Sequence, residues 1–204
     1  MKNLLSYPVL FNLFQKLVSK NNSQELFVKK YIKPNNSDNI LDLGCGTGQI
    51  IDYLPEGINY TGIDISHNYI KYAQNRYVDG YNFICKNILD IDFSTLGVFD
   101  IVIASGFFHH LDDKTIYKIL QNLQSCIKNE SKLISIDPCF VDNQNWISKL
   151  LVSNDRGEYV RNKEGYVGSL NKNFNKVDAF VHNDLLKIPY NHCICRCSDI
   201  VDSL

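Results

Sequence analysis

The sequence lacks an excess of charge of either sign. Its 21 lysine and arginine residues nearly balance its 22 aspartate and glutamate residues, which leaves a formal net charge of −1 at pH 7. The chain also has no run of basic residues, and a protein that follows a phosphate backbone needs such a surface. We therefore expect no nucleic-acid partner and no electrostatic attraction to an anionic membrane.

An apolar run long enough to cross a bilayer is also missing. The apolar N-terminal stretch, residues 4–14, is too short, Asn12 interrupts it, and no small-residue cleavage site follows it. Seven cysteines, an odd number, are scattered through the expected strands and helices and clustered near the end, which is typical of a reducing compartment. We expect a cytoplasmic protein without a membrane segment, and its oligomeric state stays open.

No internal repeat, low-complexity tract or linker divides the chain. It has 204 residues, of which 45% are hydrophobic and 21% charged, as in an ordinary soluble protein. A chain of this length can bury one good core, so we expect a single domain.

The most informative stretch is residues 39–48, where an apolar run breaks into three glycines, Gly44, Gly46 and Gly48. Glycine tolerates the positive φ and the close approach of a ligand that a sharp turn at a strand end needs. A short amphipathic helix is expected next, over Gln49–Leu54, and its first N–H groups would point at a ligand on the glycines. The stretch predicts a cofactor loop for a partly anionic ligand.

An acidic residue narrows the choice of ligand. Asp64 ends the next expected strand and lies 20 residues after Gly44, a spacing at which a carboxylate accepts ribose hydroxyls in dinucleotide folds. The third glycine of the nicotinamide fingerprint is missing, because Gln49 stands in its place. The pattern indicates an adenosine-like ligand and weakens the case for a nicotinamide cofactor.

Four segments, in order, resemble the motifs of one family, the class I S-adenosylmethionine-dependent methyltransferases. Asp42–Gly48 resembles the first motif and Gly62–Ser66 the second. Phe83–Ile88 resembles the third, and Phe99–Leu111 resembles the fourth, which faces the reactive methyl group. The resemblance implies transfer of a methyl group from S-adenosylmethionine to a small-molecule acceptor, with oxygen as the first candidate atom and nitrogen as the second.

The resemblance and the alternation of expected strands and helices imply an α/β fold. It would be a Rossmann-like doubly wound seven-stranded sheet with an antiparallel C-terminal hairpin and an N-terminal helical cap. Its fifth strand is expected at Lys132–Ile136, after a turn at Asn129–Ser131. The expected parts of the single methyltransferase domain are a cap at 1–37, a cofactor-binding core at 38–137, a substrate-side insertion at 138–172 and a terminal hairpin at 173–204.

The resemblance also assigns cofactor residues. The glycine turn would wrap the methionine part, Asp42 would assist its ammonium group, and Asp64 would accept the ribose hydroxyls. Asn87 would meet the adenine, and Ile65 would pack on the purine face. Alternatively, Asp42 caps the turn and Asn87 is an ordinary loop residue. The full set is Asp42, Gly44, Cys45, Gly46, Thr47, Gly48, Asp64, Ile65, Asn87, Ile88 and Ser105.

The catalytic candidates are His110 and His109, just past the fourth strand, where the family places the acceptor. A neutral imidazole can remove a proton from a hydroxyl or amine. Adjacent loop side chains do not easily both face one pocket, so we prefer His110 as the base and expect the other to be structural. Positioning of the two reactants is the alternative that needs no base at all.

The acceptor candidates are Phe107, Phe108, Arg156 and Tyr159. Arg156 belongs to the expected insertion, and a guanidinium group binds a carboxylate or phosphate bidentately. The competing interpretation is a solvated loop in which Arg156 and Arg161 form surface ion pairs.

No metal site is expected. Cys193, Cys195 and Cys197 would lie on one face of an alternating strand about 7 Å apart, which is too linear for a tetrahedral site without a further ligand. Core packing of the thiols is the simpler interpretation.

Three alternatives for the whole chain stay open. One is a protein or nucleic-acid methyltransferase, although the Asn/Asp-Pro-Pro-Tyr form of the fourth motif is absent. The second is a catalytically silent binding protein that uses the cofactor fold as a scaffold. The third is a nicotinamide reductase.

Overall fold

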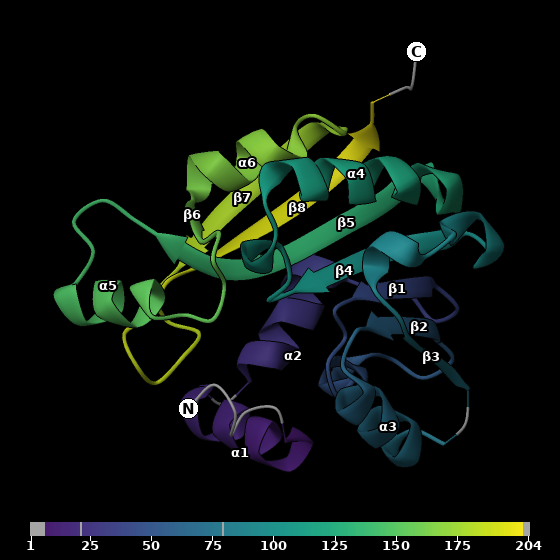
Figure 1. Ribbon diagram of the computed structural model, residues 1–204, viewed down its shortest axis with the longest axis horizontal. Helices are drawn as coiled ribbons and strands as arrows, with labels where there is room; N and C mark the ends of the chain where they lie inside the picture. Colours follow the sequence, from purple (N-terminus) through teal and green to yellow (C-terminus); the bar gives the residue numbers. More distant parts are fainter. Residues whose placement is uncertain (1–6, 21, 79, 202–204) are drawn as a thin grey trace.

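A twisted sheet forms the centre of the computed structural model, which describes residues 7–20, 22–78 and 80–201. Seven strands follow the order β3-β2-β1-β4-β5-β8-β7, and the two-residue β6 pairs with β5 beside this path (Figure 1). The strands are β1 (Asn39–Leu43), β2 (Asn59–Asp64), β3 (Tyr81–Cys85), β4 (Phe99–Ser105), β5 (Ile127–Phe140), β6 (Arg161–Asn162), β7 (Phe174–His182) and β8 (His192–Ile200).

The pairing confirms the expected fold class. The strands β1 to β5 pair in parallel with one another. β8 runs antiparallel to both β5 and β7. β1 is a short apolar run buried on both faces, as a central parallel strand must be, with Ile40 facing one layer and Leu41 the other.

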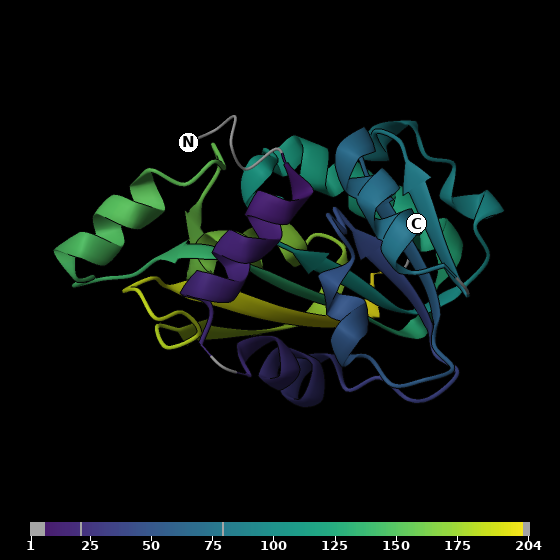
Figure 2. The same cartoon turned by 90° about the horizontal axis from the view of Figure 1, so that it is seen from below.

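Helices cover both faces of the sheet (Figures 1 and 2). One face is covered by α2 (Ser23–Phe27), the π-helical turn η2 (Val28–Ile32), the 3₁₀ turn η3 (Gln49–Tyr53) and α3 (His67–Arg76). The other face is covered by η4 (Ile88–Asp90), η5 (Phe93–Thr95), α4 (Asp113–Leu123) and α6 (Lys163–Leu170). The core therefore consists of two apolar clusters, one on each side of the sheet. Two further 3₁₀ turns are η6 (Phe108–His110) and η7 (Gln124–Cys126).

Two helices lie outside this three-layer body. α1 (Pro8–Val18) crosses below the sheet, and α5 (Trp146–Ser153) extends from one end of the molecule (Figures 1 and 2). The apolar side chains of Val9, Leu13 and Leu17 on α1 are all more than half exposed. These three side chains therefore do not anchor α1 in the core.

The structure corrects the predicted bounds of the fifth strand. β5 begins at Ile127, and the predicted turn at Asn129–Ser131 is an irregular part of this strand, where the pairing with β4 shifts in register. The Ser131 hydroxyl accepts a hydrogen bond from the Lys128 N–H and donates one to the Phe99 carbonyl, which holds the irregular segment in place. β5 also continues to Phe140, because β8 and β6 supply partners for its last residues.

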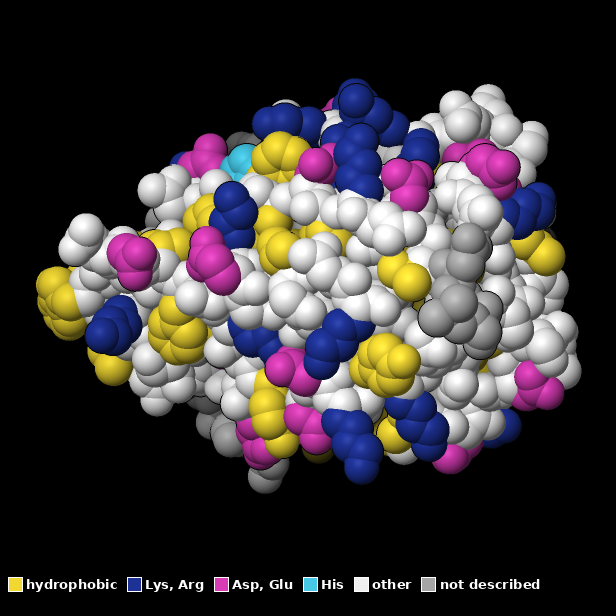
Figure 3. Space-filling model, turned by 90° about the horizontal axis from the view of Figure 1, so that it is seen from above, with side chains coloured by type: hydrophobic (Ala, Val, Ile, Leu, Met, Phe, Trp, Pro, Cys, Tyr) yellow, Lys and Arg dark blue, Asp and Glu magenta, His cyan; other side chains and the backbone are white. Residues whose placement is uncertain are grey.

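The surface carries mixed charge. On the face over α4 and α6, basic and acidic side chains are interspersed (Figure 3). Within the part of the chain that the structure describes, no helix is long and apolar enough to span a membrane.

Candidate active site

The glycine loop lies at the carboxyl end of β1 and has the backbone that only glycine adopts readily. Gly44, Gly46 and Gly48 have φ values of 71°, 56° and 72°. A Cβ at Gly44 would lie 2.6 Å from Cδ2 of Phe107, whereas a Cβ at Gly46 would meet nothing within 4 Å. Phe107 thus packs on one end of the loop, and the middle of the loop faces open space.

Asp64 holds this loop in place from the neighbouring strand. Its Oδ2 accepts a hydrogen bond from the Gly46 N–H at 2.9 Å, and its Oδ1 accepts one from the Ser66 N–H at 2.7 Å. Burial raises the pKa of Asp64, and the backbone hydrogen bonds oppose that shift. A carboxylate has about four acceptor sites, so these two bonds leave room for hydroxyl donors of a ligand.

Asp42 contributes a buried carboxylate beneath the same loop. It is 3% exposed, and its Oδ2 accepts a hydrogen bond from the Tyr60 hydroxyl at 2.7 Å. Its Oδ1 is buried without a hydrogen-bond partner among the described residues. Burial raises the pKa of Asp42 to about 7, with a further rise from the charge of Asp64 and an opposing effect of Tyr60. A cationic ligand group would satisfy the unpaired oxygen.

The other expected cofactor residues lie at the same edge of the sheet. Ile65, after β2, is 71% exposed and offers a bare apolar surface. Asn87 follows β3, and its side-chain oxygen accepts a hydrogen bond from the Leu89 N–H at the start of η4. Ile88 is buried and Ser105 is exposed at the end of β4. The structure therefore brings these positions together, and their roles toward a ligand stay predictions.

Two residues of the loop make packing contacts. The Cys45 sulfur lies where a side chain at Gly62 would have to be, which explains the glycine in β2. Thr47 is 2% exposed, and its hydroxyl donates a 2.7 Å hydrogen bond to Oδ1 of Asn12 on α1. This contact joins the N-terminal helix to the glycine loop.

The segment after β4 has one side chain that the sequence analysis placed wrongly. Phe108 is fully buried among core residues and contacts Phe107, so it is not available to an acceptor. Phe108 is the first residue of the 3₁₀ turn η6, and this turn directs its side chain into the core. Phe107 is only partly buried and remains at the loop surface.

His109 is buried in a network of carboxylates. Its Nδ1 lies 2.8 Å from Oδ1 of Asp137, and its Nε2 lies 3.1 Å from Oδ1 of Asp155. Oδ2 of Asp155 accepts a 2.6 Å hydrogen bond from the Tyr190 hydroxyl. Burial alone would lower the pKa of His109, but the hydrogen bonds and charges of the two aspartates raise it to about 9. Both ring nitrogens are therefore protonated donors at neutral pH.

His110 has the opposite character. Its side chain is exposed, and its ring centroid lies 4.0 Å from that of His109. Partial desolvation and the positive charge of His109 lower the pKa of His110 to about 4. The imidazole of His110 is thus neutral at neutral pH, which is the form that accepts a proton.

Residues 155–161, which we call the strap, cross over His109. The Tyr159 N–H donates a hydrogen bond to the His109 carbonyl at 2.9 Å, and the Gly157 backbone lies directly against the His109 ring. Arg161 donates to the carbonyls of Phe108 and Leu111 and pairs with a carboxylate on α4. Arg161 is therefore a structural residue of the strap.

The two acceptor candidates on the strap remain at its surface. Arg156 and Tyr159 are both exposed. Their proximity to the loop after β4 follows from the strap's contacts with His109. Whether an acceptor touches them stays a prediction.

Sequence reasoning missed four residues of this site: Asn12, Asp137, Asp155 and Tyr190. Asp137 carried a signal, since it is an acidic residue directly after the mostly apolar stretch 133–136 of β5, and it lies beside His109. The other three are brought in from segments whose positions no motif fixes.

The C-terminal thiols pack in the core. Cys193, Cys195 and Cys197 are buried in β8, with the first two sulfurs 3.8 Å apart. Among the described residues, no group of three histidine, cysteine, aspartate or glutamate side chains is arranged to hold a metal ion.

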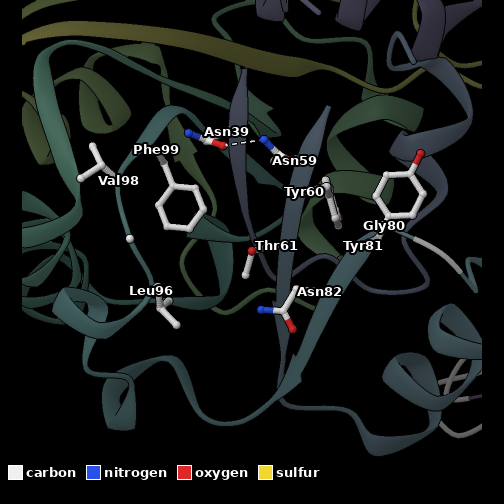
Figure 4. Close-up of a pocket in the computed structure, with 11 residues that line it drawn as sticks. Asn39, Asn59, Tyr60, Thr61, Gly80, Tyr81, Asn82, Leu96, Val98 and Phe99 are labelled. Atoms are coloured by element: carbon white, nitrogen blue, oxygen red, sulfur yellow. Dashed lines mark hydrogen bonds between the residues drawn. The ribbon is translucent and has the colours of Figure 1, made fainter. Parts of the chain in front are cut away.

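A separate hollow of about 510 Å³ opens at the opposite ends of the parallel strands from the glycine loop (Figure 4). It is lined by the amino ends of β1 to β4, where the Asn59 amide donates a hydrogen bond to Asn39. In parallel sheets of this kind ligands bind at the carboxyl ends of the strands, so the glycine loop and not this hollow is the candidate site.

The site and the topology together define a Rossmann-like protein that binds a nucleotide-type cofactor. Comparison with known proteins makes this more specific, because a methyltransferase-domain family model matches residues 40–130. A malonyl-[acyl-carrier protein] O-methyltransferase of Acetivibrio thermocellus is 36% identical over 93 residues, which are 42% of this chain and 32% of that protein. The O-methyltransferase rstn1 of Aspergillus nomiae is 30% identical over 105 residues, which are 48% of this chain and 45% of that protein.

Solved structures share the fold at lower sequence identity. The plantazolicin methyltransferase BpumL, in complex with SAH and a substrate analogue, superimposes with a TM-score of 0.63 at 19% identity and covers 87% of this chain and 83% of that one. The chain spans less than half the length of the two curated relatives named above. Its fold is that of this solved methyltransferase, and its residues 40–130 match the methyltransferase-domain model.

The residues present fit S-adenosylmethionine as the cofactor. The unpaired Oδ1 of Asp42 is suited to the ammonium group, and the open space over Gly46 admits the amino-acid chain. Asp64 and the exposed Ile65 are suited to a ribose and a purine on the β2 side.

Proposed function

We propose that the chain is an S-adenosylmethionine-dependent methyltransferase that acts on a small-molecule acceptor, through oxygen in the first place and nitrogen in the second. The observation that supports this most is the unpaired, buried oxygen of Asp42 beneath an open glycine loop. A site of that kind is suited to the cationic amino-acid end of the cofactor. The O-methyltransferase names of the two curated relatives favour oxygen.

When bound, S-adenosylmethionine would supply an electrophilic methyl group: the acceptor atom would bond to the methyl carbon in line with the breaking S–C bond, and S-adenosylhomocysteine would leave. The work of the protein is to hold two reactants in that line and to exclude water. Asp64 and the glycine loop fix the donor side, and Phe107, just after β4, packs against Gly44. The acceptor then lies between the loop after β4 and the strap.

His110 and His109 have different proposed roles. His110 is exposed and neutral, so it takes the proton of a hydroxyl or amine acceptor. His109 is a positioning residue, since both of its nitrogens donate to carboxylates and it has no lone pair for a proton. The contact of the strap with His109 supports acceptor roles for Arg156 and Tyr159.

Calorimetric titration of S-adenosylhomocysteine tests the cofactor assignment. Wild type should bind in the micromolar range, and Asp64→Ala should weaken binding at least tenfold, or about 1.4 kcal/mol, because it removes the ribose acceptor and a support of the glycine loop. Glu130→Ala, at an exposed position on the amino half of β5, serves as the control and should bind as wild type does. Absence of binding by wild type would instead support a scaffold without this cofactor.

A further inference from the structure

Asn12 is the polar contact between α1 and the glycine loop. Its Oδ1 accepts the 2.7 Å hydrogen bond from the hydroxyl of Thr47, a residue that is almost completely buried. The two residues are 35 positions apart in sequence, so this bond fixes where α1 crosses the body of the protein.

The side chain of Asn12 also has a hydrogen-bond donor without an acceptor. Nδ2 of Asn12 is buried and has no hydrogen-bond partner among the described residues. A buried amide N–H without an acceptor is unfavourable, and native proteins keep such groups where a ligand or water completes them. The donor lies at the side of the glycine loop that α1 covers.

Other described contacts of α1 lie at its C-terminal end. Its C-terminal end is attached to the β7–β8 connection, where the Lys187 N–H donates to the Val18 carbonyl and the Lys20 N–H donates to the Leu185 carbonyl. Its exposed leucine and valine side chains bury little surface against the body. Among the described side chains of α1, Asn12 thus ties the middle of the helix to the glycine loop.

The geometry of the site indicates which part of the cofactor would meet this donor. Asp64 ends β2 and Asn87 follows β3, so this side of the loop is suited to the nucleoside part. The amino-acid end then lies over the glycines, with the unpaired Asp42 oxygen available to its ammonium group. Its carboxylate is the anionic group left without a partner, and Asn12 is the donor left without an acceptor.

We propose that Nδ2 of Asn12 donates a hydrogen bond to the carboxylate of the cofactor's amino-acid end, and that this bond fixes α1 over the loaded site. The inference rests on the proposed function. It makes α1 a cofactor-dependent lid: a ligand that has the carboxylate holds the helix down, and one that lacks it does not.

Two probes separate this role from a general effect on the loop. S-adenosylhomocysteine has the amino-acid end, and 5′-methylthioadenosine is the same kind of nucleoside thioether without it. Asn12→Asp keeps an oxygen that accepts from Thr47 but replaces the donor by a negative charge. Calorimetry should show at least tenfold weaker binding of S-adenosylhomocysteine by this variant, with binding of 5′-methylthioadenosine within twofold of wild type.

A neighbouring position supplies the matched control. Gln15→Glu introduces the same change of charge one turn further along α1 and should leave the binding of both ligands within twofold of wild type. Equal losses for the two ligands in Asn12→Asp, no loss, or tighter binding of S-adenosylhomocysteine would each overturn the proposal. Failure of wild type to bind S-adenosylhomocysteine would overturn the proposed function itself, and this inference with it.

Hydrogen exchange gives a readout independent of affinity. At saturating S-adenosylhomocysteine, the backbone amides of α1 should exchange at least tenfold more slowly in wild type, while 5′-methylthioadenosine should leave them unchanged. In Asn12→Ala the slowing should be lost even at saturation. Slowing by both ligands alike would contradict the role of the carboxylate.

Discussion

The two histidines after β4 are adjacent in sequence but opposite in charge state. The sequence predicts that only one of them faces the acceptor, since neighbouring loop side chains diverge. It does not predict why, because the partners of His109 come from β5 and from the strap, 28 and 46 residues away. The structure supplies the cause: two carboxylates hold a proton on His109, and that charge helps to keep His110 neutral.

Replacement of His110 tests its proposed role as the base. His110→Asn should lower kcat on a hydroxyl acceptor about 100-fold, because general-base catalysis contributes factors of this order. The affinity for S-adenosylhomocysteine should stay within twofold, since His110 is not part of the glycine loop. Stopped-time assays of methyl transfer together with calorimetry provide the two numbers, and His67→Asn, at an exposed position on α3, is the control. Unchanged turnover by His110→Asn would show that methyl transfer depends on the positioning of the two reactants and needs no base at His110.

At the scale of elements, the parts that follow local pattern were predictable and those that depend on distant partners were not. Ser66 caps α3 as its hydroxyl and spacing suggest, by accepting from the Tyr69 N–H. β5, in contrast, exceeds its predicted end at Ile136 because β6 and β8 extend the ladder, and no local pattern reports such partners. The strap is set by contacts with His109 and with the loop after β4, so its path could not be predicted either.

The substitution Gly157→Ala tests whether the contact with His109 determines the position of the strap. A Cβ at Gly157 would lie 2.5 Å from the His109 carbonyl oxygen and would also overlap the His109 ring, so Gly157→Ala must displace the strap. We expect faster hydrogen exchange at residues 155–161 and a melting temperature several degrees lower, as core clashes typically cost 1–3 kcal/mol (about 2 kcal/mol here).

The affinity of Gly157→Ala for S-adenosylhomocysteine should remain within twofold, because the hydrogen bond that holds the glycine loop joins Gly46 to Asp64 and involves no residue of the strap. Gly168→Ala is the matched control. A Cβ at Gly168, on α6, meets nothing within 4 Å, so that variant should melt at or slightly above the wild-type temperature. A normal strap in Gly157→Ala would mean that the His109 contact does not determine its position.

At the scale of the whole molecule, alternation of strands and helices predicts the doubly wound sheet, and the structure confirms its order and its antiparallel end. The position of α1 is the part that the sequence leaves open. An apolar helix such as Pro8–Val18 is expected to be buried, yet its leucines are exposed, and its asparagine accepts a hydrogen bond from the cofactor loop. A pattern of apolar residues reports which helices form but not which surface each one covers.

The carboxylate network around His109 should make the stability of the whole fold depend on pH. The pKa of His109 is about 9 in the folded protein, against an ordinary value of 6.5, so the folded state binds the proton more tightly than the unfolded state. The resulting stabilisation is complete below about pH 6.5 and is lost as pH rises through 9. Between pH 7.5 and 9.5, which lies above the pKa of about 7 of Asp42, the expected loss is about 2 kcal/mol.

Urea unfolding at several pH values between 7.5 and 9.5 measures this loss. His109→Gln should start from a lower stability, since it leaves Asp137 and Asp155 without their cation, but its decrease over the same range should be smaller than that of wild type by about 2 kcal/mol. His67→Gln, which alters an exposed histidine of α3, should keep the wild-type slope. Parallel slopes for wild type and His109→Gln would show that His109 carries no extra proton in the folded state, and its imidazole would then be available as a base beside His110.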